Sequence, residues 1–185
     1  MNTQKTLRDS VKFKGVGLHT GCNVNMILEP AKENFGIKFQ RIDIEKSPII
    51  AANIDFVNET QRSTTLEKDG IKIVTVEHLM SALYALGVTN VLIKLDNLEV
   101  PILDGSAKYF VEGIQKVGLK VQNAPLKTIK LPDSIRYTDK ESGSEILFVP
   151  ANNFTLSALL DYENPVLGTQ YAEIKDFDNY PEEIA

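Results

Sequence analysis

The stretch IKIVTVEHLMSALYALG, residues 71–87, decides the fold class, because its first residues suit a β-strand and its later residues follow a helical spacing. We predict a helix over residues 76–86, with Thr75 as its N-terminal cap and Gly87 as its stop. Its apolar stripe comprises Val76, Leu79, Met80, Leu83 and Leu86. A strand that runs directly into a helix predicts a fold that contains both strands and helices.

Short strands are predicted on the N-terminal side of this helix. Residues 63–66 and 71–74 flank the pair Asp69-Gly70, which favours a tight hairpin because its central positions tolerate positive φ. Residues 6–39 contain short β-like runs separated by turns, and we interpret them as a meander.

A strand and a second helix are predicted on the C-terminal side. Residues 91–95 read as a strand and residues 100–102 as a short return strand. Asp104-Gly105-Ser106 opens the second helix, whose buried stripe is Phe110, Val111, Ile114 and Val117 and whose end is Gly118. The segment Leu103 to Ser106 suits either anion binding at a helix N-terminus or plain capping.

The sequence also repeats itself. LRDSVKF at residues 7–13 matches LPDSIRY at residues 131–137. Further on, Pro30-Ala31 followed by Asn34-Phe35 recurs as Pro150-Ala151 followed by Asn153-Phe154. Two matches in the same order predict a tandem duplication, although short chance matches between strands are common. Residues 1–122 would then form a complete first repeat domain, and residues 127–185 the opening strands of an incomplete second one.

Composition narrows the class of protein. The net charge is −5 and the basic residues are scattered, which argues against a nucleic-acid partner. No apolar run is long enough for a transmembrane segment, and the first residues lack the core of a secretory signal, so we expect a cytoplasmic protein. The single cysteine, Cys22, excludes a disulfide framework.

Glu77 and His78 are the principal candidates for chemistry. The chain contains two histidines, His19 and His78, so any imidazole chemistry depends on these positions. On a helical wheel His78 lies opposite the apolar stripe, among Ser81, Ala82 and Ala85, and such a face of small residues predicts the close approach of another body. A hydrolytic zinc site needs metal ligands and a carboxylate base, and this pair supplies one of each. The alternative is a surface acid beside a histidine that hydrogen-bonds at a domain interface.

A second candidate segment is GVGLHTG, residues 15–21. Three glycines around His19 indicate a backbone held close to another group, although a simple β-turn with an exposed histidine explains the pattern as well. His19, Cys22 and His78 could assemble a small zinc site. Cys22 begins an alternating strand, however, and is more simply explained as a small apolar residue.

Three motifs together, GVGLHTG, TVEHL and PILDGSA, in this order resemble the bacterial zinc-dependent UDP-3-O-acyl-N-acetylglucosamine deacetylases of lipid A biosynthesis. The resemblance implies an α+β fold of two related layered sheet-on-helices sandwich domains, similar to ribosomal S5 domain 2 and tandem duplicated, with the second repeat truncated here and the active site between the domains. It implies that Glu77 is the general base and His78 a zinc ligand. It also implies that Arg62 and Ser63 lie near the reacting end of the substrate, while His19 belongs to a motif without a derived role.

The resemblance also implies that part of the site is missing. In this family the other zinc ligands lie in the second half, so we expect the chain to be an N-terminal fragment that is inactive alone and does not retain Zn²⁺. Some members are fused to a 3-hydroxyacyl-[acyl-carrier-protein] dehydratase, and the parent of this chain could be one of them. The rival hypothesis is a non-catalytic binding or regulatory module. Strands without their covering helices should expose an apolar face, with Ile146, Phe148, Leu156, Ala158 and Leu160 as candidates, and promote self-association or partial disorder.

Overall fold

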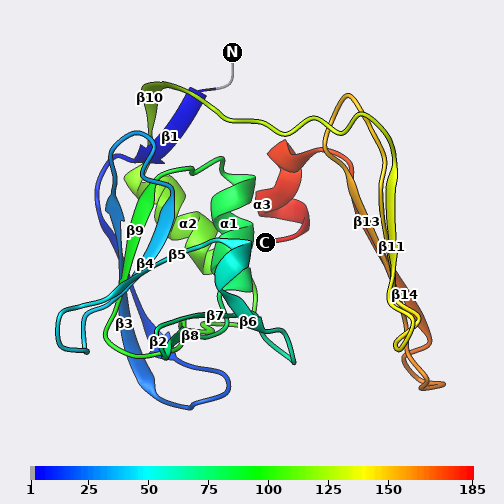
Figure 1. Ribbon diagram of the computed structural model, residues 1–185, viewed down its shortest axis with the longest axis horizontal. Helices are drawn as coiled ribbons and strands as arrows, with labels where there is room; N and C mark the ends of the chain where they lie inside the picture. Colours follow the sequence, from blue (N-terminus) through cyan, green and yellow to red (C-terminus); the bar gives the residue numbers. More distant parts are fainter. Residues whose placement is uncertain (1–2) are drawn as a thin grey trace. The chain divides into compact units, whose positions relative to one another are not determined.

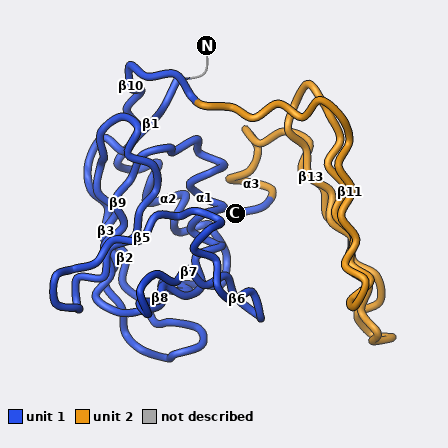
Figure 2. Tube along the Cα trace, viewed as in Figure 1, with its two compact units in different colours: residues 1–126, 184–185 blue, residues 127–183 orange. Residues whose placement is uncertain are grey.

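The computed structural model describes residues 3–185. The chain divides into two compact units (Figure 2). Unit 1 comprises residues 1–126 together with 184–185, and unit 2 comprises residues 127–183. Over the described residues, no helix is both long and apolar enough to cross a membrane.

A five-stranded sheet forms the largest layer of unit 1 (Figure 1). Its strand order is β2-β3-β9-β4-β5, and neighbouring strands are antiparallel except for the parallel pair β4–β9. A parallel pair needs a long crossover, and this one contains helix α1. The strands are β2 Val11–Val16, β3 Asn23–Pro30, β4 Ile37–Arg41, β5 Ile49–Ala51 and β9 Val91–Leu95.

Two smaller antiparallel sheets complete the strands of unit 1. One pairs β1 (Thr3–Leu7) with β10 (Leu119–Pro125). The other contains β6 (Val57–Glu59), which follows a 3-10 turn at Ile54–Phe56, together with β7 (Thr65–Lys68) and β8 (Ile71–Ile73). The turn between β7 and β8 has φ values of 52° at Asp69 and 76° at Gly70, which confirms the predicted hairpin.

Helices α1 (Glu77–Ala85) and α2 (Lys108–Val117) pack against each other beside the five-stranded sheet (Figure 1). Helix α2 approaches β2 closely: Phe13 and Phe110 meet edge to face with ring centroids 5.2 Å apart. A Cβ at Gly113 would lie 2.7 Å from the Phe13 ring, so glycine permits this approach. The predicted end of α2 is confirmed, because Gly118 follows it with φ 76°.

Three expectations for unit 1 are wrong. Residues 6–39 are not a meander: β1 pairs with the distant β10, and β9 inserts between β3 and β4. Residues 100–102 form no strand, and the segment instead makes a single β-bridge between Val74 and Glu99. Thr75 does not cap α1, because its hydroxyl donates to the Glu99 carboxylate and Val76 occupies the cap position. In each case a long-range contact overrides a local preference.

Unit 2 consists of two separate hairpins and a short helical end. Their strands are β11 Ile135–Thr138, β12 Glu145–Phe148, β13 Leu156–Asp161 and β14 Thr169–Ile174, followed by a 3-10 turn at Phe177–Asn179 and α3 at Tyr180–Glu183. The predicted exposure of apolar side chains is confirmed, with exposed fractions near one half for Ile146, Phe148, Leu156 and Leu160. Whether these side chains promote self-association stays a prediction.

Candidate active site

Glu77 and His78 are the first two residues of α1, and both are partly exposed. The Glu77 carboxylate does not point freely into solvent, because its Oε2 accepts a hydrogen bond of 2.9 Å from the Thr64 amide. This bond ties the start of α1 to the segment that carries Arg62 and Ser63. Arg62 is exposed with φ 61°, and Ser63 is half-buried. The structure therefore brings Glu77 close to the backbone that follows these two residues.

The face around His78 differs in part from the expected one. Ala82 is fully buried, so it does not belong to an open face of small residues. A small side chain suits the packed side of a helix, and α1 packs against α2. The exposed positions of α1 are Ser81 and Tyr84, while His78 and Ala85 are half-buried. His78 thus lies at the border between the packed and the accessible side.

A buried carboxylate organises the backbone next to this pair. Glu99 is only 1% exposed, and its Oε1 accepts hydrogen bonds from the His19 amide (3.0 Å) and the Thr75 hydroxyl (2.9 Å). Its Oε2 accepts from the Thr20 amide (2.9 Å) and hydroxyl (2.7 Å). Burial alone would raise the pKa of Glu99, but these donors together outweigh it and hold the pKa below its ordinary value. The group is therefore an ionised carboxylate at neutral pH.

The glycine-rich segment owes its shape to Glu99. A Cβ on Gly17 would lie 2.2 Å from Glu99 Oε2 and 2.4 Å from Thr20 Oγ1, so only glycine allows the carboxylate to enter the loop. The expectation that this backbone is held close to another group is confirmed, and the group is a side chain of the same chain. The side chain of His19 itself is exposed.

Sequence reasoning missed Glu99. The available signal was an acidic residue directly before the apolar Val100-Pro101-Ile102, where a charge needs a specific partner if it is buried. That signal does not reveal the partners, because the nearest of them in the sequence, Thr75, is 24 residues away.

Residues 104–106, which precede α2, form a turn held by their own side-chain hydrogen bonds. Asp104 Oδ1 accepts from the Ser106 amide (3.0 Å) and hydroxyl (2.8 Å), and these donors lower the pKa of Asp104. Ser106 Oγ in turn accepts from the Lys108 amide at 3.2 Å. Local turn hydrogen bonds thus account for these side chains. The residue at the cap position is Ala107, which has no side-chain acceptor.

The described side chains do not by themselves assemble a metal site. Within residues 3–185 no three His, Cys, Asp or Glu side chains come together as a possible metal site. His19, Cys22 and His78 therefore do not form a small zinc site, and Cys22 is exposed rather than an apolar core residue. His78 fits one zinc ligand and Glu77 fits a neighbouring base, whereas a catalytic zinc needs three protein ligands.

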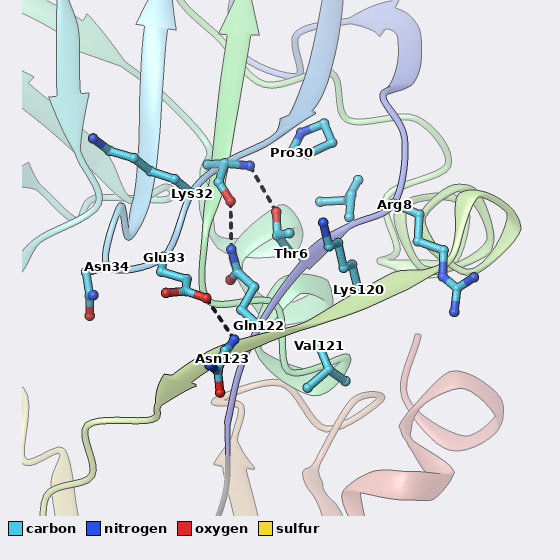
Figure 3. A pocket seen from close by; sticks show the side chains of 12 residues that line it. Thr6, Arg8, Pro30, Lys32, Glu33, Asn34, Lys120, Val121, Gln122 and Asn123 are labelled. Carbon is cyan, nitrogen blue, oxygen red and sulfur yellow. Dashed lines mark hydrogen bonds between the residues drawn. The ribbon is translucent and has the colours of Figure 1, made fainter.

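A separate hollow lies between β1, residues 30–34 and β10 (Figure 3). Several of its polar groups are bonded within the chain: the Ala31 amide donates to Thr6 Oγ1 at 3.0 Å, and Gln122 Nε2 donates to the Ala31 carbonyl at 3.0 Å (Figure 3). The buried side-chain Nδ2 of Asn90 donates to the Oε1 atoms of both Gln4 and Gln122. The hollow contains none of the predicted site residues, and its network joins β1 and β10 to the main sheet.

The fold and site define an α+β protein with a carboxylate–imidazole pair at the start of a helix. Over residues 4–185 the chain matches the family described as LpxC, UDP-3-O-acyl N-acetylglycosamine deacetylase, and it belongs to that family. This confirms the resemblance drawn from the three motifs.

Several curated relatives are similar to this chain. The Bifunctional enzyme LpxC/FabZ of Bacteroides thetaiotaomicron is 44% identical over 185 residues, which cover 100% of this chain and 40% of the relative. The UDP-3-O-acyl-N-acetylglucosamine deacetylase of Chromohalobacter salexigens is 44% identical over 170 residues, or 92% of this chain and 55% of the relative. That of Pseudoalteromonas atlantica is 38% identical over 189 residues, or 100% and 62%. The chain therefore spans between 40% and 62% of these relatives' lengths.

Proposed function

We propose that this chain forms the N-terminal part of a zinc-dependent amidase that deacetylates UDP-3-O-(3-hydroxyacyl)-N-acetylglucosamine in lipid A biosynthesis, in the cytoplasm. The observation that carries the proposal is the Glu77-His78 pair at the start of α1, with the Glu77 carboxylate oriented by the Thr64 amide. The Thr64 amide engages Oε2 and so fixes the orientation of the carboxylate at the start of α1. Such an oriented, partly exposed carboxylate is suited to general-base catalysis.

His78 would hold the zinc ion as one ligand, and Glu77 would act as the base beside it. A zinc ion in such a site supplies Lewis-acid activation of water and of the amide carbonyl. Arg62 and Ser63, immediately before Thr64, would face the reacting end of the substrate. The remaining ligands would come from a related second domain of the same polypeptide, outside this sequence.

The proposed domain organisation follows from the repeat. Residues 1–122 would be a complete S5 domain 2-like repeat, and residues 127–185 the opening strands of the second repeat. This would explain why the unit 2 hairpins expose apolar side chains. The 185 residues alone would be inactive and would not retain zinc. Two relatives with the printed name Bifunctional enzyme LpxC/FabZ support a parent that is also fused to a dehydratase.

The test is zinc content by elemental analysis together with deacetylation of the UDP-sugar, on this chain and on a longer polypeptide containing the downstream half. We expect zinc and activity in the longer polypeptide only. His78→Ala should lose both, Glu77→Gln should keep zinc and lose roughly 100-fold or more in kcat, and His19→Ala should keep zinc. One equivalent of zinc in the 185-residue chain would refute the expectation that the remaining ligands lie in the downstream half. A zinc-loaded longer polypeptide without deacetylase activity would refute the proposed activity.

A further inference from the structure

The segment containing Glu99 lies between two parts of the chain that are distant in sequence. On one side the Val74 amide donates to the Leu98 carbonyl (2.9 Å), and the Val100 amide donates to the Val74 carbonyl (3.0 Å). On the other side the Ile102 amide donates to the Val16 carbonyl at 2.9 Å. The backbone of residues 98–102 thus joins the residue before Thr75 to the end of β2, where the glycine-rich loop begins. The Glu99 side chain adds hydrogen bonds to both parts of the chain.

The carboxylate connects the same two parts through its two oxygens. Residues 17–22, which we call the His19 loop, contribute the amides of His19 and Thr20 and the Thr20 hydroxyl. Thr75 contributes its hydroxyl from the residue that precedes Val76-Glu77-His78. All four donors are uncharged, and together they occupy both oxygens. A glutamine amide could not replace this group, because its NH₂ cannot accept the donors that face one of the oxygens.

The backbone on both sides has a conformation that needs such support. Thr75 has φ 60°, a left-handed value that is unfavourable for a β-branched residue. Left-handed non-glycine residues persist where the surrounding structure holds them, and they concentrate at functional sites. In the loop, Gly17 can have no side chain because the carboxylate occupies that space. The loop and the entry to α1 are therefore held in one geometry by the same side chain.

From these contacts we propose that Glu99 is a positioning residue for the deacetylase reaction. Its carboxylate fixes the His19 loop to Thr75, and thereby sets the position of Glu77 and His78 relative to the exposed His19 side chain. This inference rests on the proposed function. Glu99 is itself 1% exposed, so it acts through the groups it holds and not by touching the substrate. A misplacement of about 1 Å at a reacting group can cost roughly 100-fold in rate.

The test compares Glu99→Gln with the matched control Glu29→Gln. Glu29 is also a strand-associated glutamate of unit 1, but it is half-buried and pairs with Lys94 at 2.7 Å, away from the His19 loop. In the 185-residue chain, ¹H–¹⁵N NMR should show upfield shifts of the His19 and Thr20 amide protons in Glu99→Gln and no such shifts in the control. In the longer, zinc-loaded polypeptide, kcat should fall roughly 100-fold in Glu99→Gln with KM changed less than about threefold, and the control should stay within about twofold.

The possible results separate the positioning role from the proposed function. Unchanged amide shifts in Glu99→Gln would overturn the hydrogen-bonded link itself. Shifted amides with an unchanged kcat would overturn the positioning role while the deacetylase function stands, and Glu99 would then be purely structural. Inactivity of the unaltered longer polypeptide would refute the proposed function and with it the positioning role, whatever the amide shifts.

Discussion

Gly17→Ala is the substitution whose effect can be worked out most directly from the structure. The added Cβ would lie 2.2 Å from Glu99 Oε2, whereas ordinary contacts begin at 3.4 Å. The carboxylate must therefore retreat by about 1 Å, which breaks its bonds of 2.9 Å and 2.7 Å with the Thr20 amide and hydroxyl. Hydrogen bonds to charged groups contribute about 1.5–3 kcal/mol each, so the expected loss in the free energy of unfolding for the two bonds is about 3–6 kcal/mol.

The assay is urea unfolding followed by far-ultraviolet circular dichroism, since the chain contains no tryptophan. The matched control is Gly21→Ala in the same loop. Gly21 has φ 63°, but a Cβ added there would have no heavy atom within 4 Å, so alanine incurs only backbone strain of about 1–2 kcal/mol. Equal losses for the two variants would refute the argument that Glu99 occupies the space beside Gly17.

Three further predictions concern the carboxylate, the core and the hairpins. Because the pKa of Glu99 is lowered in the folded state, the stabilisation by its carboxylate should be complete above pH 4.5 and disappear as the pH falls through the folded-state pKa. The difference in the free energy of urea unfolding between the unaltered chain and Glu99→Gln should therefore shrink in acid. A difference that grows in acid would contradict this pH dependence. Phe110→Ala should lower the free energy of unfolding, measured by thermal or urea unfolding, by about 3–5 kcal/mol. Tyr109→Ala, at a half-exposed position of the same helix, should lower it by less than about 1 kcal/mol. The 185-residue chain should self-associate with rising concentration in analytical ultracentrifugation, and Phe148→Asp should reduce this; a monomer at all concentrations would refute it.

Local features of the structure followed from local sequence. The β7–β8 hairpin was predictable because the conformation of its turn depends mainly on Asp69 and Gly70 themselves. The span of α1 was predictable to within one residue at each end, and the end of α2 at Gly118 followed from the same kind of reasoning. Family membership followed from three short motifs in a fixed order. The chemical roles of Glu77 and His78 stay predictions.

Non-local features did not follow from the sequence. Strand β9 pairs with both β3 and β4, and β1 pairs with β10, although nothing in the separate strands specifies these partners. Pairing depends on which apolar faces are buried together, a property of the assembled core. The face of α1 was misjudged at Ala82 for the same reason, because a small residue can lie on either side of a helix until its neighbour is known.

The sequence by itself determined the elements with local causes, the family, and the adjacency of Glu77 and His78. Only the tertiary structure decided how the candidate site is held together. Glu99 and the His19 amide are 80 residues apart in the chain, and the left-handed conformation of Thr75 opposes its local preference for capping. A buried carboxylate is stable only when several donors converge on it, and the folded backbone is what brings those donors to one place.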